Sequence, residues 1–498
     1  MRTTHSIVPG LCHRLAVVVM LAQPVAALDG FAVASEPKFT VPEFTVPAGQ
    51  RQLFLDDFGI AKIENLKRTM HQPRKKGAVI RPNFAEGETS ITTRSGPAWD
   101  EQEQVFKLWP IFPACYESRD GLHWTRTKPQ PTVAVISAVI DPDDPDPNRR
   151  YKGLVSVSGG REPVVSPDGI RWKRLDVPKI ASQDESNLHY DRLTRTFIAT
   201  VKHRGPFGRT VWLSTSRDFE KWTKPELIFH PDERDQELAR TNIKARLANP
   251  TLQPMFHNNP ETYNVQVYNM GVFRYEGLYI GMPAMFHSTG PVPNYPNTDG
   301  FHLIQLVCSR DLRKWQRLGD RQPFIGPSPA GAGAYDLTQI LPPSHPVVRG
   351  DELWFYYTGI KFRSGSTYAG KYPDGKWVPR PGLDKDTGAI CLAVLRRDGF
   401  VSLDAGEQPG TLLTRPFQSP GGKLFANVDA LEGALRVEAL DSDGKVLAVS
   451  APLKGDQTRG EIEWKEGNFA ELKGKTISLR FSLQAASLYS YCLGGDDK

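Results

Sequence analysis

Short runs of mainly hydrophobic residues recur along the whole chain. Clear examples lie at residues 105–109, 211–213, 278–282 and 353–357. Short apolar runs bounded by turn signals are typical of buried strands. The 43 glycines and 41 prolines separate many of these runs, and tight turns use both residue types. The pattern therefore predicts an all-β protein built from many short strands.

The composition supports a folded core and argues against a nucleic-acid partner. Hydrophobic residues make up 39% of the 498 residues and charged residues 24%, which excludes a disordered chain, a collagen and a coiled coil. The formal net charge is only +6. The longest basic cluster, residues 74–76, is expected to be a solvated loop rather than part of a concentrated basic face. Cys115, Cys308 and Cys391 lie in strand-like runs without a CxxC pair, so we expect buried thiols.

The first residues have the order of an export signal. Residues 1–14 carry two arginines and no acid, residues 15–22 are apolar, and small residues precede Ala27 and Ala34. This order predicts a signal peptide over residues 1–27, a linker over 28–50, and a periplasmic or secreted protein. The apolar run is much shorter than the roughly 20 residues of a membrane-spanning helix. We therefore expect no membrane partner.

One short motif, Ser-x-Asp-x-x-x-Trp, is repeated along the chain. Full copies begin at Ser118, Ser166, Ser216 and Ser309, and a shortened copy covers residues 397–400. An aspartate at a tight reversal accepts backbone N–H groups, and a glycine supplies a positive φ. Because the tryptophan recurs in every full copy, we interpret it as a structural residue that covers the edge of a sheet. A repeated hairpin of this kind predicts a β-propeller.

The spacing of the motifs leaves two blade counts. The first three copies are about 50 residues apart, which suits blades of roughly 40–50 residues, but the later gaps are nearly twice as long. The chain therefore has either seven blades with two lost turns or five blades with two long insertions. We favour five blades over residues 51–405, because residues 229–260 and 361–388 show little alternation.

The last part of the chain has a more regular pattern. Hydrophobic residues alternate cleanly at residues 435–439 and again at 477–483. Short antiparallel strands over about 90 residues are typical of a small β-sandwich. We therefore expect a C-terminal β-sandwich over residues 406–498.

The motifs together resemble a known group of proteins. Besides the hairpins, the resemblance rests on residues 52–57, 184–187, 333–336, 351–357 and 397–403. On these residues the chain is similar to the five-bladed propeller glycoside hydrolases of families 32 and 43, in particular to exported bacterial family-32-like proteins. The resemblance implies a carbohydrate substrate. The Trp-Met-Asn-Asp-Pro and Arg-Asp-Pro motifs of family 32 have no match here, and its Glu-Cys motif has no clear one.

Candidate carboxylates follow from the geometry of a propeller. The first strand of each blade lines the central funnel, and glycoside hydrolysis needs two carboxyl groups beside the scissile bond. Acids near the start of these strands are Asp184, Glu185, Asp336 and Glu88. Asp184 and Asp336 are the favoured pair. Glu185 follows Asp184 directly, so alternation predicts that only one of the two enters the funnel.

Five further residues are candidates for binding the sugar. They are chosen because they are hydrogen-bonding or aromatic side chains near the same strand ends or in the second insertion: Asn187, Arg94, His189, Tyr335 and Trp377. No metal-ligand spacing, phosphate loop or dinucleotide fingerprint is visible, so we expect no metal and no cofactor. The oligomeric state stays open.

The sequence thus favours an exported glycoside hydrolase that acts on a poly- or oligosaccharide through a funnel carboxylate pair. Two alternatives remain because the family 32 motifs are missing. One is a carbohydrate-binding propeller without catalysis, and the other is a structural propeller scaffold.

Overall fold

The computed structural model describes residues 44–331, 333–363 and 365–494. The predicted signal peptide and residues 28–43 of the predicted linker lie outside the described residues. Five sheets follow one another along the chain, and they form the five blades of a β-propeller. The predicted five-bladed fold is confirmed.

Each blade is an antiparallel sheet, and in blades one to four the first strand in the chain is the innermost, whereas in blade five the innermost strand is β23 (Gln339–Leu341). Blade one contains β5 (Ala98–Asp100), β6 (Val105–Leu108), β7 (Tyr116–Ser118) and β8 (Thr125–Arg126). Blade two contains β9 (Val135–Ile140), β10 (Tyr151–Val157), β11 (Gly160–Ser166), β12 (Lys173–Arg174) and β13 (Ile180–Ala181). Blade three contains β14 (Ser186–Asp191), β15 (Thr196–Gly205), β16 (Gly208–Ser216) and β17 (Glu226–Phe229).

The last two blades contain five strands each, as blade two does. Blade four contains β18 (Asn264–Tyr275), β19 (Leu278–Pro291), β20 (Thr298–Ile304), β21 (Val307–Ser309) and β22 (Gln316–Arg317). Blade five contains β23 (Gln339–Leu341), β24 (Val347–Arg349), β25 (Glu352–Ile360), β28 (Gly388–Arg396) and β4 (Arg74–Ile80). Short 3₁₀ turns lie in the connections: η1 (Phe84–Glu86), η2 (Pro147–Arg149), η3 (Pro260–Thr262) and η4 (Gly319–Arg321).

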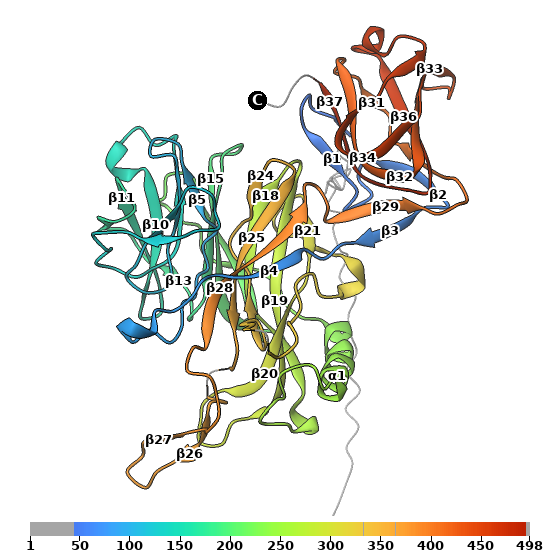
Figure 1. Cartoon of the computed structure of the whole chain (residues 1–498). Coiled ribbons are helices and arrows are strands. Elements are labelled where there is room, and N and C mark those ends of the chain that lie inside the picture. The colour runs from blue at the N-terminus through green and yellow to red at the C-terminus, as the bar shows by residue number, and fades with distance from the viewer. Residues whose placement is uncertain (1–43, 332, 364, 495–498) are drawn as a thin grey trace, which may run out of the picture. The chain divides into compact units, whose positions relative to one another are not determined.

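Blade five joins the two ends of the propeller. Its outermost strand, β4, precedes blade one in the sequence and pairs antiparallel with β28, with Ile80 opposite Ile390 and Arg74 opposite Val394 (Figure 1). Hydrogen bonds between the first and last parts of the propeller chain therefore close the ring.

The repeated motif forms the turn between the third and fourth strands of blades one to three, and between β21 and β22 of blade four. In the second copy, Asp168 Oδ1 accepts the backbone N–H groups of Ile170 and Arg171 at 2.9 and 2.8 Å. Trp172 Nε1 donates to the carbonyl oxygen of Gly169 at 2.9 Å. The other three copies repeat this hydrogen-bond pattern. The structural interpretation of the aspartate and the tryptophan is confirmed.

The residue after each turn aspartate adopts a left-handed conformation. Its φ is +74° at Gly121 and +78° at Gly169, but the third and fourth copies place Phe219 and Leu312 there, both at +65°. A left-handed residue with a side chain costs about 1–2 kcal/mol. Both of these side chains are buried in the hydrophobic core, so apolar burial offsets the backbone strain.

The two predicted insertions lie in blades four and five, but the first is more regular than expected. Residues 233–248 form α1 (Glu233–Ala248), whose first turn carries a capping box between Asp232 and Asp235. Polar residues occupy almost every face of this helix, and its buried apolar side chains are Ala239 and Ile243. The sequence therefore shows no amphipathic pattern from which a helix could be predicted. Salt bridges from Arg317 and Arg321 to the two capping aspartates hold it to blade four. The second insertion forms a two-stranded hairpin of β26 (Tyr368–Lys371) and β27 (Trp377–Pro379).

The C-terminal part forms one curled sheet, and the expected separate β-sandwich is not confirmed. The sheet takes up strands that precede the propeller: β1 (Arg51–Leu53), β2 (Ile60–Glu64) and β3 (Lys67–Met70). It continues with β29 (Val401–Ala405), β30 (Gly410–Thr414), β31 (Phe417–Gln418), β32 (Lys423–Leu440), β33 (Val446–Ser450), β34 (Leu453–Glu461), β35 (Trp464–Glu466), β36 (Thr476–Gln484) and β37 (Ala486–Gly494). The 3₁₀ turn η5 (Phe469–Leu472) lies before β36.

The core of this curled sheet contains the residues that the alternation predicted. Leu435, Val437 and Ala439 of β32 are buried, as are the alternating hydrophobic residues of β36. Phe44 and Val46, from the end of the predicted linker, are buried in the same core. The sequence pattern of the C-terminal part alone did not show that residues 44–70 complete its sheet.

Asp398 of the shortened fifth motif connects the curled sheet to the propeller. Its carboxylate accepts hydrogen bonds from Arg51 Nη1 at 2.8 Å, Tyr275 Oη at 2.6 Å and Ser490 Oγ at 2.6 Å. Asp398 is fully buried. Arg51 and Ser490 belong to β1 and β37, and Tyr275 belongs to β18, so one carboxylate ties three distant segments together.

The described cysteines are buried and form no disulfide, in agreement with the sequence interpretation. No helix within the described ranges is long and apolar enough to cross a membrane.

Candidate functional site

Charged and aromatic side chains from all five blades meet at one end of the central funnel. The funnel cluster, as we name it, lies where the first strands of the blades begin and where the hairpins between second and third strands turn. Its members are Arg94, Arg161, Asp184, Glu185, Lys202, Arg209, Tyr268, Phe286, His302 and Arg363.

Glu185 is the buried carboxylate of the funnel cluster. Arg94 binds both of its oxygens, with Nε 2.5 Å from Oε2 and Nη2 2.7 Å from Oε1. Both side chains are buried, and although burial opposes charging of Arg94, the neighbouring Glu185 raises the arginine pKa. This two-pronged pair joins blade one to blade three and fixes the position of the Glu185 carboxyl group.

Asp184 is the exposed carboxylate of the funnel cluster. Its side chain is 66% exposed, and Oδ1 accepts a hydrogen bond from Lys202 Nζ at 2.8 Å. Burial works to raise the pKa of Asp184, but the charge and hydrogen bond of Lys202 outweigh it and lower the pKa. Asp184 is therefore an ionised carboxylate that a ligand in solution can reach.

Lys202 lies between the two carboxylates and an aromatic ring. Its ammonium group is 3.7 Å from the centre of the Tyr268 ring. Burial lowers its pKa to about 8, against the favourable charges of Glu185 and Asp184. Lys202 is therefore the group of this cluster that changes charge nearest to neutral pH.

An aromatic layer lies beside these charges. The His302 ring is 4.9 Å from both Tyr268 and Phe286, measured between ring centres. The guanidinium group of Arg363 is 4.1 Å from the centre of the Phe286 ring, and that of Arg209 is 5.7 Å from it. Burial lowers the pKa of His302 well below its usual value, so its imidazole is neutral.

Asn187 is buried in the interior of the propeller, below the funnel cluster. Its Nδ2 donates to the Arg94 carbonyl oxygen at 3.1 Å, and its Oδ1 accepts from Asn269 Nδ2 at 3.0 Å. Ser344 Oγ donates to the same carbonyl oxygen at 2.7 Å and lies 3.1 Å from Ser137 Oγ. Both ends of the Asn187 amide are thus used within the protein.

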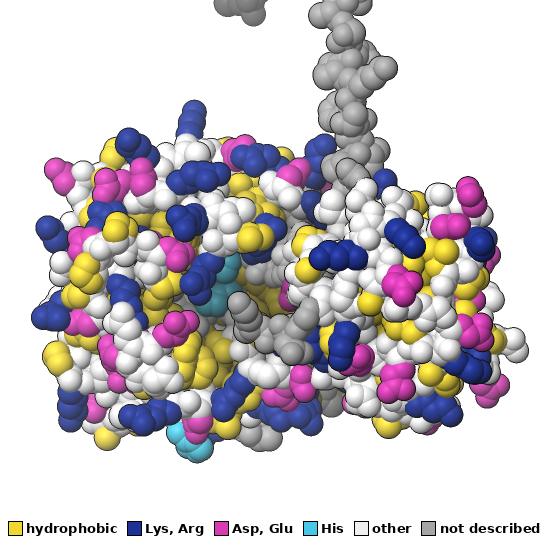
Figure 2. Space-filling view, turned by 90° about the horizontal axis from the view of Figure 1, so that it is seen from above, with side chains coloured by type: hydrophobic (Ala, Val, Ile, Leu, Met, Phe, Trp, Pro, Cys, Tyr) yellow, Lys and Arg dark blue, Asp and Glu magenta, His cyan; other side chains and the backbone are white. Residues whose placement is uncertain are grey.

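His189 lies at the opposite end of the channel. Its ring centre is 5.5 Å from that of His345, and Arg274 N donates to its Nε2 at 3.2 Å. Both histidines line a cavity of about 400 Å³ at the far ends of β9 and β14. Figure 2 shows histidine side chains in a hollow near the centre of the face seen there. Glu185 directly precedes β14, and Asn187 and His189 follow at every second position within it, but the three side chains lie at different depths.

The structure does not bring Asp336 to the funnel cluster. Its carboxylate is 2.7 Å from Lys75 Nζ and accepts a hydrogen bond from Tyr357 Oη at 2.8 Å. Lys75 and Tyr357 belong to β4 and β25, so Asp336 lies inside blade five. Its neighbour Tyr335 donates to Asp386 at 2.7 Å, also within blade five.

Glu88 lies in the loop before blade one. It forms an ion pair with Arg126 at 2.8 Å and accepts the backbone N–H of Asn83 at 2.9 Å. These contacts order a loop outside the funnel cluster.

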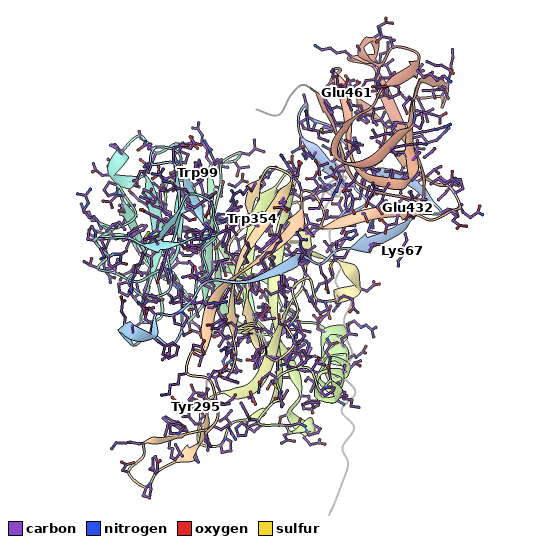
Figure 3. All side chains as sticks on the ribbon, in the orientation of Figure 1. Lys67, Trp99, Tyr295, Trp354, Glu432 and Glu461 are labelled. Atoms are coloured by element: carbon purple, nitrogen blue, oxygen red, sulfur yellow. The ribbon has the colours of Figure 1, made fainter. Side chains whose placement is uncertain are left out.

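Trp377 lies in an aromatic group of its own hairpin. Its ring stacks on Tyr368 at 5.1 Å and meets the edge of Tyr295 at 5.4 Å, and Lys371 Nζ lies 4.4 Å from its centre. Figure 3 shows Tyr295 beside this hairpin. The contacts pin the hairpin to the loop after β19.

Most of the funnel cluster was missed by the sequence reasoning. The rule used there searched only the start of each innermost strand, which yields Arg94, Asp184 and Glu185. Lys202 and Arg209 lie on either side of the β15–β16 hairpin, and Arg161 lies just after the β10–β11 turn. In an antiparallel blade this hairpin reaches the same end as the start of the first strand. A search of these hairpins as well as the strand starts would have found Arg161, Lys202 and Arg209.

Comparisons with known proteins give fold-level similarity only. No protein-family model and no curated protein matches the sequence. Solved structures that are similar include an N-acetylgalactosamine deacetylase from F. plautii, at 14% identity and a TM-score of 0.39, covering 68% of this chain and 96% of that one. A family 32 β-fructofuranosidase from Bombyx mori has 10% identity and a TM-score of 0.36, covering 84% and 94%. A family 43 arabinoxylan arabinofuranohydrolase from Bacillus subtilis has 10% identity and a TM-score of 0.33, covering 84% and 99%.

Proposed function

We propose that the protein is an exported glycosidase that binds a poly- or oligosaccharide at the funnel cluster. The observation that carries the proposal is the convergence of polar side chains from five blades on Asp184, an exposed, ionised carboxylate. A site of this kind offers several hydrogen-bonding groups and aromatic surfaces to one ligand, as saccharide sites require.

The proposed mechanism uses the two adjacent carboxylates. Asp184 reaches the ligand and either attacks the anomeric carbon, with water later hydrolysing the glycosyl-enzyme bond, or activates a water molecule for that attack. In both cases the bond to the leaving oxygen breaks and that oxygen takes its proton from water. Glu185, held by two hydrogen bonds from Arg94, lies beside the site where an oxocarbenium-like transition state forms. Lys202 donates to Asp184 at 2.8 Å and keeps that carboxylate ionised. Asp336 takes no part in this scheme, since its carboxylate is bound inside blade five.

One observation favours the alternative, a carbohydrate-binding propeller without catalysis. Both funnel carboxylates are ion-paired. Against the effect of burial, Lys202 lowers the pKa of Asp184, whereas a usual glycosidase acid has a raised pKa. In the binding alternative Asp184 and Lys202 hold sugar hydroxyl groups and no bond is cleaved.

A screen separates the two functions. The purified protein is incubated with a panel of oligosaccharides, and new reducing ends and bound ligand are both measured. Product from any member supports the glycosidase. Binding without product supports the alternative, and neither binding nor product across the panel contradicts both.

A further inference from the structure

The funnel cluster contains more positive than negative charge. Arg161, Arg209 and Arg363 come from blades two, three and five, and none of them forms a salt bridge with a carboxylate in the described ranges. The two carboxylates of the cluster, Asp184 and Glu185, are already paired with Lys202 and Arg94.

Arg161 is the most deeply buried of the three. Its Nε donates to Ser186 Oγ at 2.8 Å and its Nη1 donates to the Gly160 carbonyl oxygen at 2.8 Å. Its Nη2 is buried and has no hydrogen-bond partner. Burial lowers the pKa of Arg161, and neither Asp184 nor Glu185 fully compensates.

Arg209 and Arg363 are held by neutral groups. Arg209 donates to Gln266 Oε1 at 2.9 Å and to Asn297 Oδ1 at 2.8 Å. Arg363 donates through Nε to the Thr298 carbonyl oxygen at 2.7 Å and is almost fully buried. Their contacts with the Phe286 ring stabilise the cations but cancel none of their charge.

The nearest further acid does not pair with these arginines. Asp299 accepts the backbone N–H groups of Phe256 and His257 at 2.8 and 3.0 Å and the hydroxyl of Ser366 at 2.6 Å. These donors use both of its oxygens. The cluster has five basic side chains and, when Asp299 is counted, three acidic ones, so the basic side chains exceed the acidic ones by two. The basic set is Arg94, Arg161, Lys202, Arg209 and Arg363, and the acidic set is Asp184, Glu185 and Asp299.

Buried cations without counter-charges destabilise the folded chain unless something else compensates them. Guanidinium groups match carboxylate and sulfate oxygens in charge and in geometry. We propose that the funnel binds an anionic saccharide, one whose sugar rings carry carboxylate or sulfate ester groups. This inference rests on the proposed saccharide function and adds the chemical class of the ligand.

The geometry divides the ligand between two parts of the cluster. One anionic group of the ligand lies against Arg209 and Arg363, which share the Phe286 ring, and another lies against Arg161. The sugar ring lies against the exposed part of Tyr268, next to Asp184 and Lys202. A neutral saccharide leaves the three arginines unpaired and gains only the second set of contacts.

Binding to Asp184→Asn protein by calorimetry tests the inference without turnover. Three oligosaccharides of equal length are compared: a neutral one, a uronate one and a sulfated one, with inorganic sulfate as a further ligand. We expect at least one anionic oligosaccharide to bind about tenfold or more tighter than the neutral one, because hydrogen bonds to charged groups contribute about 1.5–3 kcal/mol. The two anionic ligands distinguish a carboxylate from a sulfate ester.

Matched variants locate the effect. Arg209→Gln, at a half-buried side chain, is expected to weaken anionic binding about tenfold and to weaken neutral binding much less. Arg234→Met, which removes an exposed arginine of α1, is the control and is expected to change neither. Circular dichroism confirms that each variant is folded.

Two results overturn the inference. One is neutral binding as tight as anionic binding, and the other is anionic affinity that Arg209→Gln leaves unchanged. If neutral oligosaccharides are bound or cleaved while anionic ones are not, the anionic class is wrong and the proposed function stands. If no saccharide binds at all, the proposed function falls as well.

Discussion

Lys202 Nζ lies 2.8 Å from Asp184 Oδ1, so a nearly fully buried ammonium group holds an exposed carboxylate at the mouth of the funnel. The same nitrogen lies over the Tyr268 ring at 3.7 Å. Glu185 and Arg209 are the other charged groups that face it. The pair connects a buried cation of the site to the exposed carboxylate that a ligand meets first.

The charge of Lys202 predicts a pH limit for anion binding. Burial lowers the pKa of Lys202 from 10.5 to about 8, so its positive charge is present below pH 8 and is lost as the pH rises through that value. Affinity for an anionic oligosaccharide, measured by calorimetry from pH 6 to pH 9, is expected to fall on the alkaline side. Lys202→Arg keeps its charge over this range and is expected to remove the fall. An unchanged profile in Lys202→Arg would show that another group titrates.

Asp168 is expected to stabilise its turn through the two backbone hydrogen bonds that it accepts. Asp168→Ala should lower the free energy of unfolding by about 1–2 kcal/mol. Asp176→Ala, at an exposed aspartate of the same blade, is the control for removing a carboxylate. Urea unfolding of both variants gives the difference. Equal stability of the two variants would contradict the structural role of the turn aspartate.

The same turn predicts an acid sensitivity. Burial alone would raise the pKa of Asp168, but its hydrogen bonds outweigh burial and lower the pKa to about 2. A carboxylate whose folded pKa is lowered contributes stability above its unfolded pKa, and that contribution is lost as the pH falls. Between about pH 4 and pH 2 the wild type should lose more stability than Asp168→Ala, as followed by tryptophan fluorescence. Parallel losses in the two proteins would refute this assignment.

Substitution of Gly169 is expected to be destabilising both through backbone strain and through a steric clash. A pair of variants separates the two effects. Its φ is +78°, and an added Cβ would lie 2.7 Å from the Trp109 ring. Gly474 has a φ of +76° but open space around it. Gly474→Ala should cost about 1 kcal/mol of unfolding free energy from backbone strain alone, and Gly169→Ala should cost clearly more. Equal costs in thermal unfolding would mean that the clash relaxes freely.

The buried Asp398 carboxylate is expected to couple the unfolding of the curled sheet to that of the propeller. Asp398→Ala removes the carboxylate that binds Arg51, Tyr275 and Ser490. Breaking a buried pair of this kind typically costs about 3 kcal/mol or more. Calorimetry is expected to show a lowered melting temperature, and Asp443→Ala on an exposed turn should show no change. A wild-type-like melting curve for Asp398→Ala would contradict the connecting role.

The blades were predictable from the sequence, and much of the site was not. The turn motif is local: its aspartate, its left-handed residue and its tryptophan contact one another within seven positions, so the chain itself displays the constraint. The funnel cluster is assembled from distant parts of the chain, and no fixed spacing relates Arg161 to Arg363. Alternation predicted that only one of Asp184 and Glu185 enters the funnel, whereas both belong to the funnel cluster. Alternation also carries no information on depth, so Asn187 and His189 were assigned to the same site. Asp336 was chosen for its place in the sequence, while its side chain turns into blade five toward Lys75.

Asp184 tests the central claim most directly. Once the oligosaccharide screen identifies a substrate, kcat/KM is measured for wild type, Asp184→Asn and Asp336→Asn. Asp184→Asn is expected to lose a factor of about 100 or more, with an unchanged fold by circular dichroism. Asp336→Asn should change thermal stability and leave the rate close to wild type. Full activity in Asp184→Asn would contradict the account of the funnel.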